Sequence, residues 1–280
     1  MRSPLPAQER SNPLVGIGRM SLKAAVAAFL LFVVLGPLAG LVIWSFTITW
    51  FWPSVLPTEW GLKYWGFVGN SGMMKALTTG VLIAVTVTLL CLLIATPLSY
   101  LLARVKIPFK PLILLLFLLP QAFPQLPVFA NTAAILYRFN MGGKVSGVIM
   151  IHLVGALVFA VWTLTAVFKS IPVSLEEAAI NLGASRTRAF LTVALPLALP
   201  GLIASSVLVF LWSLDEFTGT LLVGAPFVQT LPTFMYAAAQ GYELQVASIT
   251  AILLMVPGIV MLALMERYLK SEYLSKFGGA

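Results

Sequence analysis

Side chains that could carry chemistry are few in this 280-residue sequence, and their types already exclude several kinds of site. The chain contains one histidine, His152, and one cysteine, Cys91. A disulfide within the chain and a metal site built from several thiolates or imidazoles are therefore excluded. The sequence also offers no nucleophile paired with a base and no carboxylate dyad in a plausible pocket. We therefore expect no catalytic residue, no bound metal and no cofactor.

Two adjacent acids, Asp215 and Glu216, follow a long apolar run in the segment Trp212-Ser-Leu-Asp-Glu-Phe. Acidic groups that border hydrocarbon are costly, and they usually face a protein interior or a watery cavity. Carboxylates there would attract an ammonium group, and the rings of Trp212 and Tyr236 would add cation–π attraction. These four residues form a candidate solute pathway. A structural role stays open for Asp215, as a helix cap or the partner of a lysine, and it is the favoured interpretation of Glu216.

The overall composition is that of a membrane protein. Hydrophobic residues make up 60% of the chain and charged residues only 9%, against roughly 45–50% and about 25% in soluble domains. This apolar excess excludes a water-soluble monomer and a disordered chain. The formal charge of +8 falls in short basic clusters between apolar runs, which is typical of membrane topology rather than of nucleic-acid binding.

Six apolar runs are long enough for helices that cross a hydrocarbon layer of ~30 Å. Because they lack the alternation of a membrane β-strand, the expected fold is an all-α integral membrane protein with six transmembrane helices. Pro120, Pro124 and Pro127 interrupt the third run, where we expect a kinked or partly unwound helix. The runs are Ala24–Ile48, Leu77–Ala103, Leu112–Leu136, Ser146–Phe168, Leu197–Leu214 and Val246–Met265.

The distribution of lysine and arginine predicts the orientation of these helices. If the N-terminus is cytoplasmic, thirteen of the 17 basic residues fall on the cytoplasmic side, which is the side that positive residues favour. Both tails, residues 1–23 and 267–280, are therefore expected in the cytoplasm.

Two segments on the outer side have an unusual composition. Thr49–Asn70 is rich in tryptophan, which indicates an aromatic belt at the membrane interface, with a docking surface for an outside partner as the alternative. Thr218–Thr233 is apolar but contains several glycines and prolines. We expect it to form a re-entrant or folded loop that is buried against protein.

The inner loop 169–196, between the fourth and fifth runs, begins with the pattern of a short helix. Ser174 and Glu177 have the spacing of a capping box, which would start a helix just after Pro172. Gly183 is placed to end this helix in a left-handed conformation.

A second short helix is expected from about Ser185 to Ala194, after which Pro196 begins the return to the membrane. Two helices joined by a glycine and lying under the bilayer would present a small, defined knob.

This loop resembles the EAA loop of type I ABC-importer permeases, whose pattern is E-A-A, three residues, G, nine residues, I, one residue and L-P. The sequence reads Glu177-Ala178-Ala179, then Gly183, then Val193-x-Leu195-Pro196. The one departure is valine in place of isoleucine, which nearly conserves the volume of an apolar side chain. The resemblance implies the type I permease fold, with an ABC type-1 transmembrane domain over 72–266 that follows the first span at 24–48.

In that family the EAA helix inserts into a cleft on an ATPase subunit and transmits ATP-driven closure to the membrane helices. The resemblance thus makes Glu177, Ala178, Ala179, Gly183, Arg186 and Arg188 candidate ATPase-coupling residues. The alanines would allow close approach, Glu177 would pair with a basic residue of the partner, and the arginines would pair with acids. These residues also have structural explanations, because Gly183 could serve only as a helix cap and the two arginines could reflect only the positive-inside bias.

The resemblance also implies an assembly and its location. A second, homologous permease, two ATPase subunits and a periplasmic substrate-binding protein would join this chain in the lipid bilayer of a bacterial inner membrane. The chain has no phosphate-binding G-x-x-x-x-G-K-[ST] loop, since Gly143-Lys144 lacks a glycine five residues earlier. We therefore expect ATP hydrolysis on a separate chain. Because the basic residues lie between apolar runs, we also expect no nucleic-acid partner.

The S-L-D-E-F stretch, with the G-A-P and T-L-P that follow, resembles the spermidine/putrescine branch of these permeases, although Gly224-Ala225-Pro226 carries an inserted residue. The expected solute is a polyamine or another amine. Other members of the branch imply an opine, an amino-acid-like compound, an aminophosphonate or ferric iron. Rival interpretations from other classes are an ion-coupled secondary carrier that uses His152 and Asp215, and a membrane anchor that only assembles other proteins.

Overall fold

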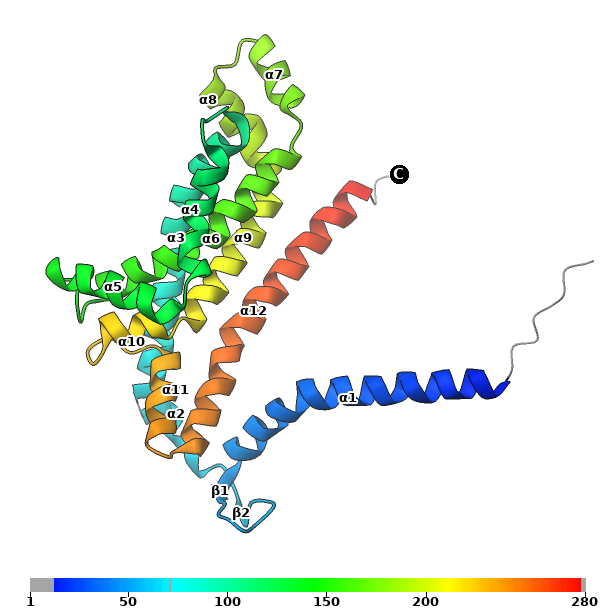
Figure 1. The fold of residues 1–280 in the computed structure, drawn as a ribbon, viewed down its shortest axis with the longest axis vertical. Coiled ribbons are helices and arrows are strands. Elements are labelled where there is room, and N and C mark those ends of the chain that lie inside the picture. Colours follow the sequence, from blue (N-terminus) through cyan, green and yellow to red (C-terminus); the bar gives the residue numbers. More distant parts are fainter. Residues whose placement is uncertain (1–12, 71, 278–280) are drawn as a thin grey trace, which may run out of the picture.

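The computed structural model describes residues 13–70 and 72–277, which fold into a bundle of long helices (Figure 1). Short helices lie at one end of the molecule and a β-hairpin lies at the other. Its helices are α1 (Pro13–Ser45), α2 (Phe67–Asn70), α3 (Gly72–Arg104), α4 (Lys110–Ala122), α5 (Gln125–Arg138), α6 (Val145–Ser170), α7 (Val173–Asn181), α8 (Arg186–Ala189), α9 (Leu195–Asp215), α10 (Thr218–Gly224), α11 (Leu231–Gln240) and α12 (Leu244–Phe277). The same residues form an antiparallel pair of strands, β1 (Thr47–Thr49) and β2 (Glu59–Trp60), a 3-10 helix (Lys63–Gly66) and a π-helix (Phe190–Ala194).

Within the described residues, five helices are long and apolar enough to cross a membrane, and they coincide with five of the six predicted runs. They are Leu22–Ser45 of α1, α3, α6, the continuous helix Arg186–Asp215, and Leu244–Arg267 of α12. The predicted all-α membrane fold is confirmed.

The third run, expected as a kinked or partly unwound helix, is interrupted more sharply than expected. It is divided into α4 and α5, which are bent by 101° relative to one another. Phe123, at the break, is extended with φ −98° and ψ 156°, because the proline that follows disfavours a helical conformation there. Pro124 also has no N–H group to continue the helix. The described chain has six spans only if this bent pair is counted as one.

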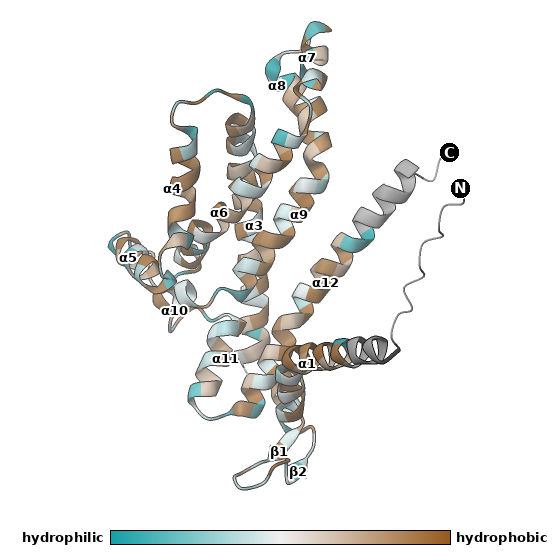
Figure 2. Ribbon diagram, turned by 45° about the vertical axis from the view of Figure 1, so that its right-hand side comes forward, coloured by the Kyte–Doolittle hydropathy of each residue, from teal (hydrophilic) through white to brown (hydrophobic). Residues whose placement is uncertain are grey.

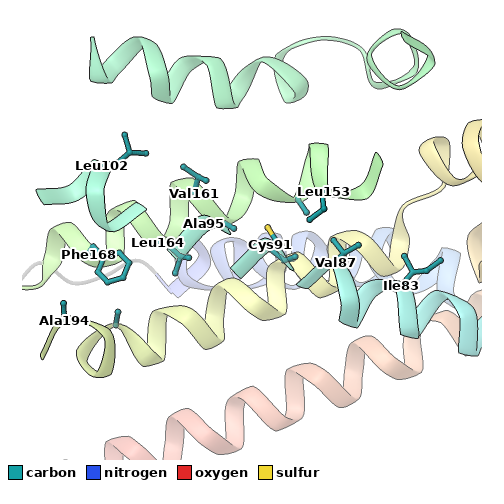
Figure 3. Packing of buried hydrophobic residues seen from close by; sticks show 14 of the residues in the cluster. Ile83, Val87, Cys91, Ala95, Leu102, Leu153, Val161, Leu164, Phe168 and Ala194 are labelled. Atoms are coloured by element: carbon teal, nitrogen blue, oxygen red, sulfur yellow. The ribbon is translucent and has the colours of Figure 1, made fainter. Parts of the chain in front are cut away.

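The core of the bundle lies where α3, α6 and α9 pack together, and Figure 3 shows buried side chains of this core. Glycines allow the helices to approach closely. A Cβ atom at Gly155 of α6 would overlap the ring of Trp212 in α9, and one at Gly201 of α9 would overlap Val167 in α6. Such small residues favour helix association in lipid, where there is no hydrophobic driving force between helices.

Helix α1 leaves the bundle at a wide angle and packs against α12 (Figure 1). The most apolar window of its span contains no residue that is buried within the chain, and Figure 2 shows how hydrophobic this helix is. An apolar surface of this kind is stable against lipid or against other transmembrane helices.

The two segments that were predicted on the outer side, Thr49–Asn70 and Thr218–Thr233, both contain regular structure. The β1–β2 hairpin is tied by a hydrogen bond from Thr49 Oγ1 to Glu59 Oε2 (2.9 Å), and Trp52 at its tip is almost fully exposed. Thr218–Thr233 forms α10, a turn and the start of α11, and α10 packs on α6 and α5 with Gly219 and Thr220 buried. The prediction of a folded segment is thus confirmed, and its burial against protein holds for α10 and the start of α11, whereas Phe227 in the turn between them is 82% exposed.

Candidate coupling site and solute cavity

Helices α7 and α8 form a small knob at the end of the molecule opposite the β1–β2 hairpin (Figure 1). We call residues 173–189 the coupling knob. Its first helix begins at Val173, directly after Pro172, as predicted. The predicted capping box is wrong, however, because the helix has Pro172 as its N-cap and no side-chain cap. The extended Pro172 leaves Ser174 at the second helical position, past the position from which a capping hydroxyl bonds the first turn.

Gly183 ends α7 in the way the sequence predicts. Its φ is +94°, in the left-handed region that side chains with a Cβ atom adopt at a cost. The N–H of Gly183 donates to the carbonyl of Ile180 (2.9 Å), and the N–H of Ala184 donates to that of Ala179 (3.0 Å). This pair of bonds is a Schellman motif, which satisfies two of the free carbonyls at the end of the helix.

The second helix of the knob differs from the expected separate element. Ser185 caps α8 by accepting a hydrogen bond from the N–H of Arg188 (3.2 Å), so the helix starts where it was predicted. It does not stop near Ala194, because it widens into the π-helix and continues without a break as far as Asp215. In the π-helix the N–H of Leu195 bonds Phe190, five residues back, and the widened turn precedes Pro196, which has no N–H to offer.

The six predicted coupling residues all lie on the knob and are largely open to solvent. Glu177, Ala178 and Gly183 are exposed, Ala179 is half-buried, and the side chains of Arg186 and Arg188 are exposed. Leu182, at the tip, is 90% exposed. A protruding helix with exposed apolar and charged groups is suited to insertion into another protein.

Glu176, the acidic neighbour of Glu177, is not among the residues that the sequence predicts for this site. Glu176 is buried and contacts Arg104 and Tyr100 of α3, on the inner side of α7. Consecutive helical residues point about 100° apart. Once the exposed face of α7 is known, the helical period therefore places Glu177 on that face and Glu176 away from it.

A cavity of about 620 Å³ lies between α1, α9, α11 and α12. We call it the solute cavity. It is lined by Asp215 and Tyr236, which were both predicted, and by Trp44 and Phe217. The rings of Phe217 and Tyr236 are 4.9 Å apart between centroids. Among the described residues that line the cavity, Asp215 is the one side chain that is charged near neutral pH. A carboxylate beside aromatic rings can accept hydrogen bonds from hydroxyls or attract a cation.

The other two residues of the predicted pathway lie elsewhere. Trp212 packs over Gly155 of α6 and makes an edge contact with the ring of His152, 6.2 Å between centroids. Glu216 is only 4% exposed, and its carboxylate accepts hydrogen bonds from the N–H groups of Gly219 (2.6 Å) and Thr220 (2.9 Å) at the start of α10. The structure therefore brings Asp215 and Tyr236 together and separates them from Trp212 and Glu216.

No salt bridge is found for Asp215 among the described residues, so a lysine of this part of the chain does not pair with it. Within the same residues, no three His, Cys, Asp or Glu side chains gather closely enough to hold a metal ion. His152 is fully buried and hydrogen-bonded to Ser213 and Thr220, each at 2.8 Å.

Comparison with known proteins places this geometry in a family. Residues 95–273, which include the coupling knob and Asp215, match the family described as binding-protein-dependent transport system inner membrane component. A protein named putative ABC transporter permease protein ORF1, from Streptomyces antibioticus, is 30% identical over 206 residues, which cover 72% of this chain and 90% of that protein.

Two further relatives have names that state a solute. The trehalose transport system permease protein SugB of Mycobacterium tuberculosis is 28% identical over 73% of this chain and 77% of its own length. The diacetylchitobiose uptake system permease protein NgcG of Streptomyces coelicolor is 27% identical over 77% of this chain and 73% of its own length.

The fold also matches a solved structure. A chain of a bacterial ABC transporter that imports the acidic polysaccharide alginate superposes with a TM-score of 0.67 at 18% identity, covering 94% of this chain and 99% of that one. The extent of the family match and the 30% identical relative, together with the shared fold, show that this chain belongs to the binding-protein-dependent transport system inner membrane components, the permease subunits of type I ABC importers.

Proposed function

We propose that this chain moves a small organic solute across the inner membrane by ATP-driven alternating access. One observation carries the proposal: a single continuous helix, Arg186–Asp215, joins the coupling knob at one end to Asp215 of the solute cavity at the other. A push on the knob would displace this helix as a unit and change the surroundings of the cavity. ATP binding by a partner would then shift the population between two states of the cavity.

The partners in this proposal are a second, homologous permease, two ATPase subunits and a periplasmic binding protein. The apolar surface of α1 supports a further membrane subunit, because the most apolar window of that helix contains no residue that the described part of the chain buries. The exposed Glu177, Leu182 and Arg186 of the knob support an ATPase beneath it. In this arrangement the knob and both termini face the cytoplasm, and the β1–β2 hairpin faces the periplasm.

For the solute we propose a carbohydrate, such as a disaccharide. The relatives named for trehalose and for diacetylchitobiose support this class. The solute cavity supports it too, because Trp44, Phe217 and Tyr236 offer apolar ring faces to the C–H groups of a sugar. Asp215 would accept hydrogen bonds from its hydroxyl groups. At about 620 Å³ the cavity falls within the ~300–1,000 Å³ that is typical of small-molecule sites.

The amine that the S-L-D-E-F motif suggests is the second candidate. The single carboxylate of Asp215 and the rings of Phe217 and Tyr236 would also attract an organic cation. Sugar and amine differ in one respect that an experiment can use: a cation needs the negative charge of Asp215, whereas a neutral sugar needs only its hydrogen-bond acceptors.

The experiment that tests the proposal is to isolate the complex that contains this chain and reconstitute it in lipid vesicles. We expect an ATPase and a second permease to copurify, and we expect ATP-dependent uptake of trehalose or a chitobiose in a panel that includes putrescine and spermidine. Uptake of only the amines would replace the sugar with an amine as the solute. Transport by this chain alone, without ATP, would overturn the importer and favour an ion-coupled carrier.

A further inference from the structure

Helix α7 is tied to the end of α3 by a buried ion pair. Arg104 is the last residue of α3, and its Nη2 and Nε atoms lie 2.6 Å and 2.7 Å from Glu176 Oε1. The hydroxyl of Tyr100, one turn earlier in α3, donates to Glu176 Oε2 (2.5 Å). Both oxygens of the carboxylate are thus bonded by α3, and the pair is 10% and 6% exposed at Arg104 and Glu176.

The same arginine also holds the chain that leads into α7. Its Nη2 donates to the backbone carbonyl of Ile171 at 3.0 Å, between the end of α6 and the start of α7. Arg104 therefore fixes α7 at two points, one on the helix itself and one on the segment before it. A planar guanidinium with several N–H donors can make such bonds together, which a lysine ammonium with its single nitrogen cannot do in the same geometry.

Tyr100 extends this link to two further elements. Its ring packs on Phe190 of the π-helix, with centroids 4.5 Å apart, and edge-on against Phe168 of α6 at 5.5 Å. The carboxylate of Glu176 is thereby joined, through one tyrosine, to the place where α3, α6 and the start of the long helix Arg186–Asp215 meet.

Apolar packing does not fill the space between α7 and α3. A cavity of about 500 Å³ lies between them and α8, and it is lined by apolar side chains such as Leu101 and Ile180 and by the bonded residues Tyr100, Arg104 and Glu176. α7 packs mainly on α8 and the π-helix. With a cavity beside it, α7 is joined to α3 directly by the hydrogen bonds and the ion pair of Glu176. A buried ion pair resists separation because either charge left alone in apolar surroundings is costly.

We propose that Glu176, Arg104 and Tyr100 are positioning residues that pass a displacement of α7 on to α3. The inference rests on the proposed function, and it gives the adjacent residues Glu176 and Glu177 different roles. Glu177 is exposed at the edge of this cavity, where an ATPase would reach it, whereas Glu176 is buried against α3 and makes α7 and α3 move together. Without this link, a partner could move the knob while α3 stays behind.

The test measures motion in the isolated complex with its ATPase and needs no solute. Spin labels are placed at two exposed positions, Asn181 of α7 and Leu93 of α3, and the distance between them is measured before and after trapping with MgATP and vanadate. In the otherwise unchanged protein we expect this distance to stay nearly constant, because the two helices move together. In Glu176→Gln we expect it to change on trapping, since the neutral amide cannot hold the arginine as a carboxylate does.

The same preparations give a functional readout. We expect ATP hydrolysis by Glu176→Gln to lose its response to the binding protein by about tenfold, within the roughly 5–150-fold span of coupling between two sites. Exchanging the charges in Arg104→Glu with Glu176→Arg should restore part of the response. Glu243→Gln is the matched control, because Glu243 is exposed and belongs to the turn before α12.

A label distance that does not change on trapping in Glu176→Gln would overturn the proposal. So would a Glu176→Gln protein that is less stable to heat but whose ATP hydrolysis still responds fully to the binding protein. If Glu176→Gln does not assemble, Tyr100→Phe removes a single hydrogen bond and keeps the test decisive. Failure of the proposed function would look different, because the unchanged protein would then bring no ATPase with it and would trap no nucleotide.

Discussion

The Nε2 atom of His152 in α6 lies 3.1 Å from Oε2 of Glu216, and both side chains are almost completely buried. The other ring nitrogen of His152 bonds Ser213 in α9, and Thr220 of α10 bonds both partners of the pair. One polar cluster therefore connects α6, the end of α9 and the start of α10. It holds the turn that places the neighbouring Asp215 at the solute cavity.

Removal of the Glu216 carboxylate should destabilise this turn. In Glu216→Ala the N–H groups of Gly219 and Thr220 and the His152 ring lose a buried acceptor, and each buried group left without a partner costs about 1–3 kcal/mol. We expect a clear fall in the midpoint of thermal unfolding in detergent, with a smaller fall for Glu216→Gln, which keeps one acceptor oxygen. Glu243→Ala, at an exposed position, should leave the midpoint unchanged. An equal midpoint for Glu216→Ala would refute the anchoring role of this cluster.

The different positions of the adjacent Asp215 and Glu216 side chains could not be predicted from the sequence. Both acids adjoin the same apolar run, and although a structural role is the favoured interpretation of Glu216, the sequence does not indicate which groups bind it. The helix ends at Asp215, however, and Glu216 is extended with φ −68° and ψ 121°. This turn sends one carboxylate toward the cavity and the other to the N-terminus of α10, and it depends on a buried histidine 64 residues earlier in the chain.

The long spans were predictable because their length and apolar composition report directly on the membrane. The end of α7 was predictable because a left-handed cap needs glycine. The Arg104–Glu176 pair was not, since the partners are separated by 72 residues and meet only once α3 and α7 are placed. The sharp bend at Phe123 was underestimated for a similar reason, because three prolines indicate a break but do not give its angle.

Gly183 provides a test of the coupling knob through its backbone alone. A Cβ atom at this position would meet no other atom within 4 Å, yet φ is +94°. Gly183→Ala should therefore add backbone strain of about 1–2 kcal/mol without a clash. We expect a lower affinity for the ATPase, measured by binding to the detergent-solubilised complex, with little change in membrane insertion.

Gly241→Ala is the matched control for that variant. Gly241 also ends a helix, but its φ is −79° and a Cβ atom there would make only ordinary contacts at 3.5 Å. If both variants bind the ATPase equally well, the left-handed cap does not position the knob for its partner.

Glu177→Ala separates an ATP-driven importer from an ion-coupled carrier. The side chain is exposed at the knob, so its loss should leave insertion and unfolding temperature unchanged while it removes a charged contact to the ATPase. We expect uptake by cells that express the complex to fall strongly, by about tenfold or more if the contact resembles other close charge pairs at interfaces. Substantial remaining transport that collapses with the ion gradient would instead support the carrier.

Asp215→Asn separates the two solute classes, because it removes a charge and keeps the shape of the side chain. An amide retains a carbonyl oxygen as acceptor and gains donors, so uptake of a neutral sugar should change by less than about tenfold. Uptake of an organic cation should fall much further, since the charge is lost from a cavity in which Asp215 is the one carboxylate among the described lining residues. The measurement is initial uptake of labelled trehalose and of labelled putrescine at equal protein levels, with Tyr236→Phe as the companion variant.

The Tyr236→Phe change preserves the ring beside Phe217 and removes only the hydroxyl. It should therefore reduce sugar uptake and leave cation–π attraction in place. A strong loss in Asp215→Asn with none in Tyr236→Phe would therefore assign an amine to this permease in place of a sugar.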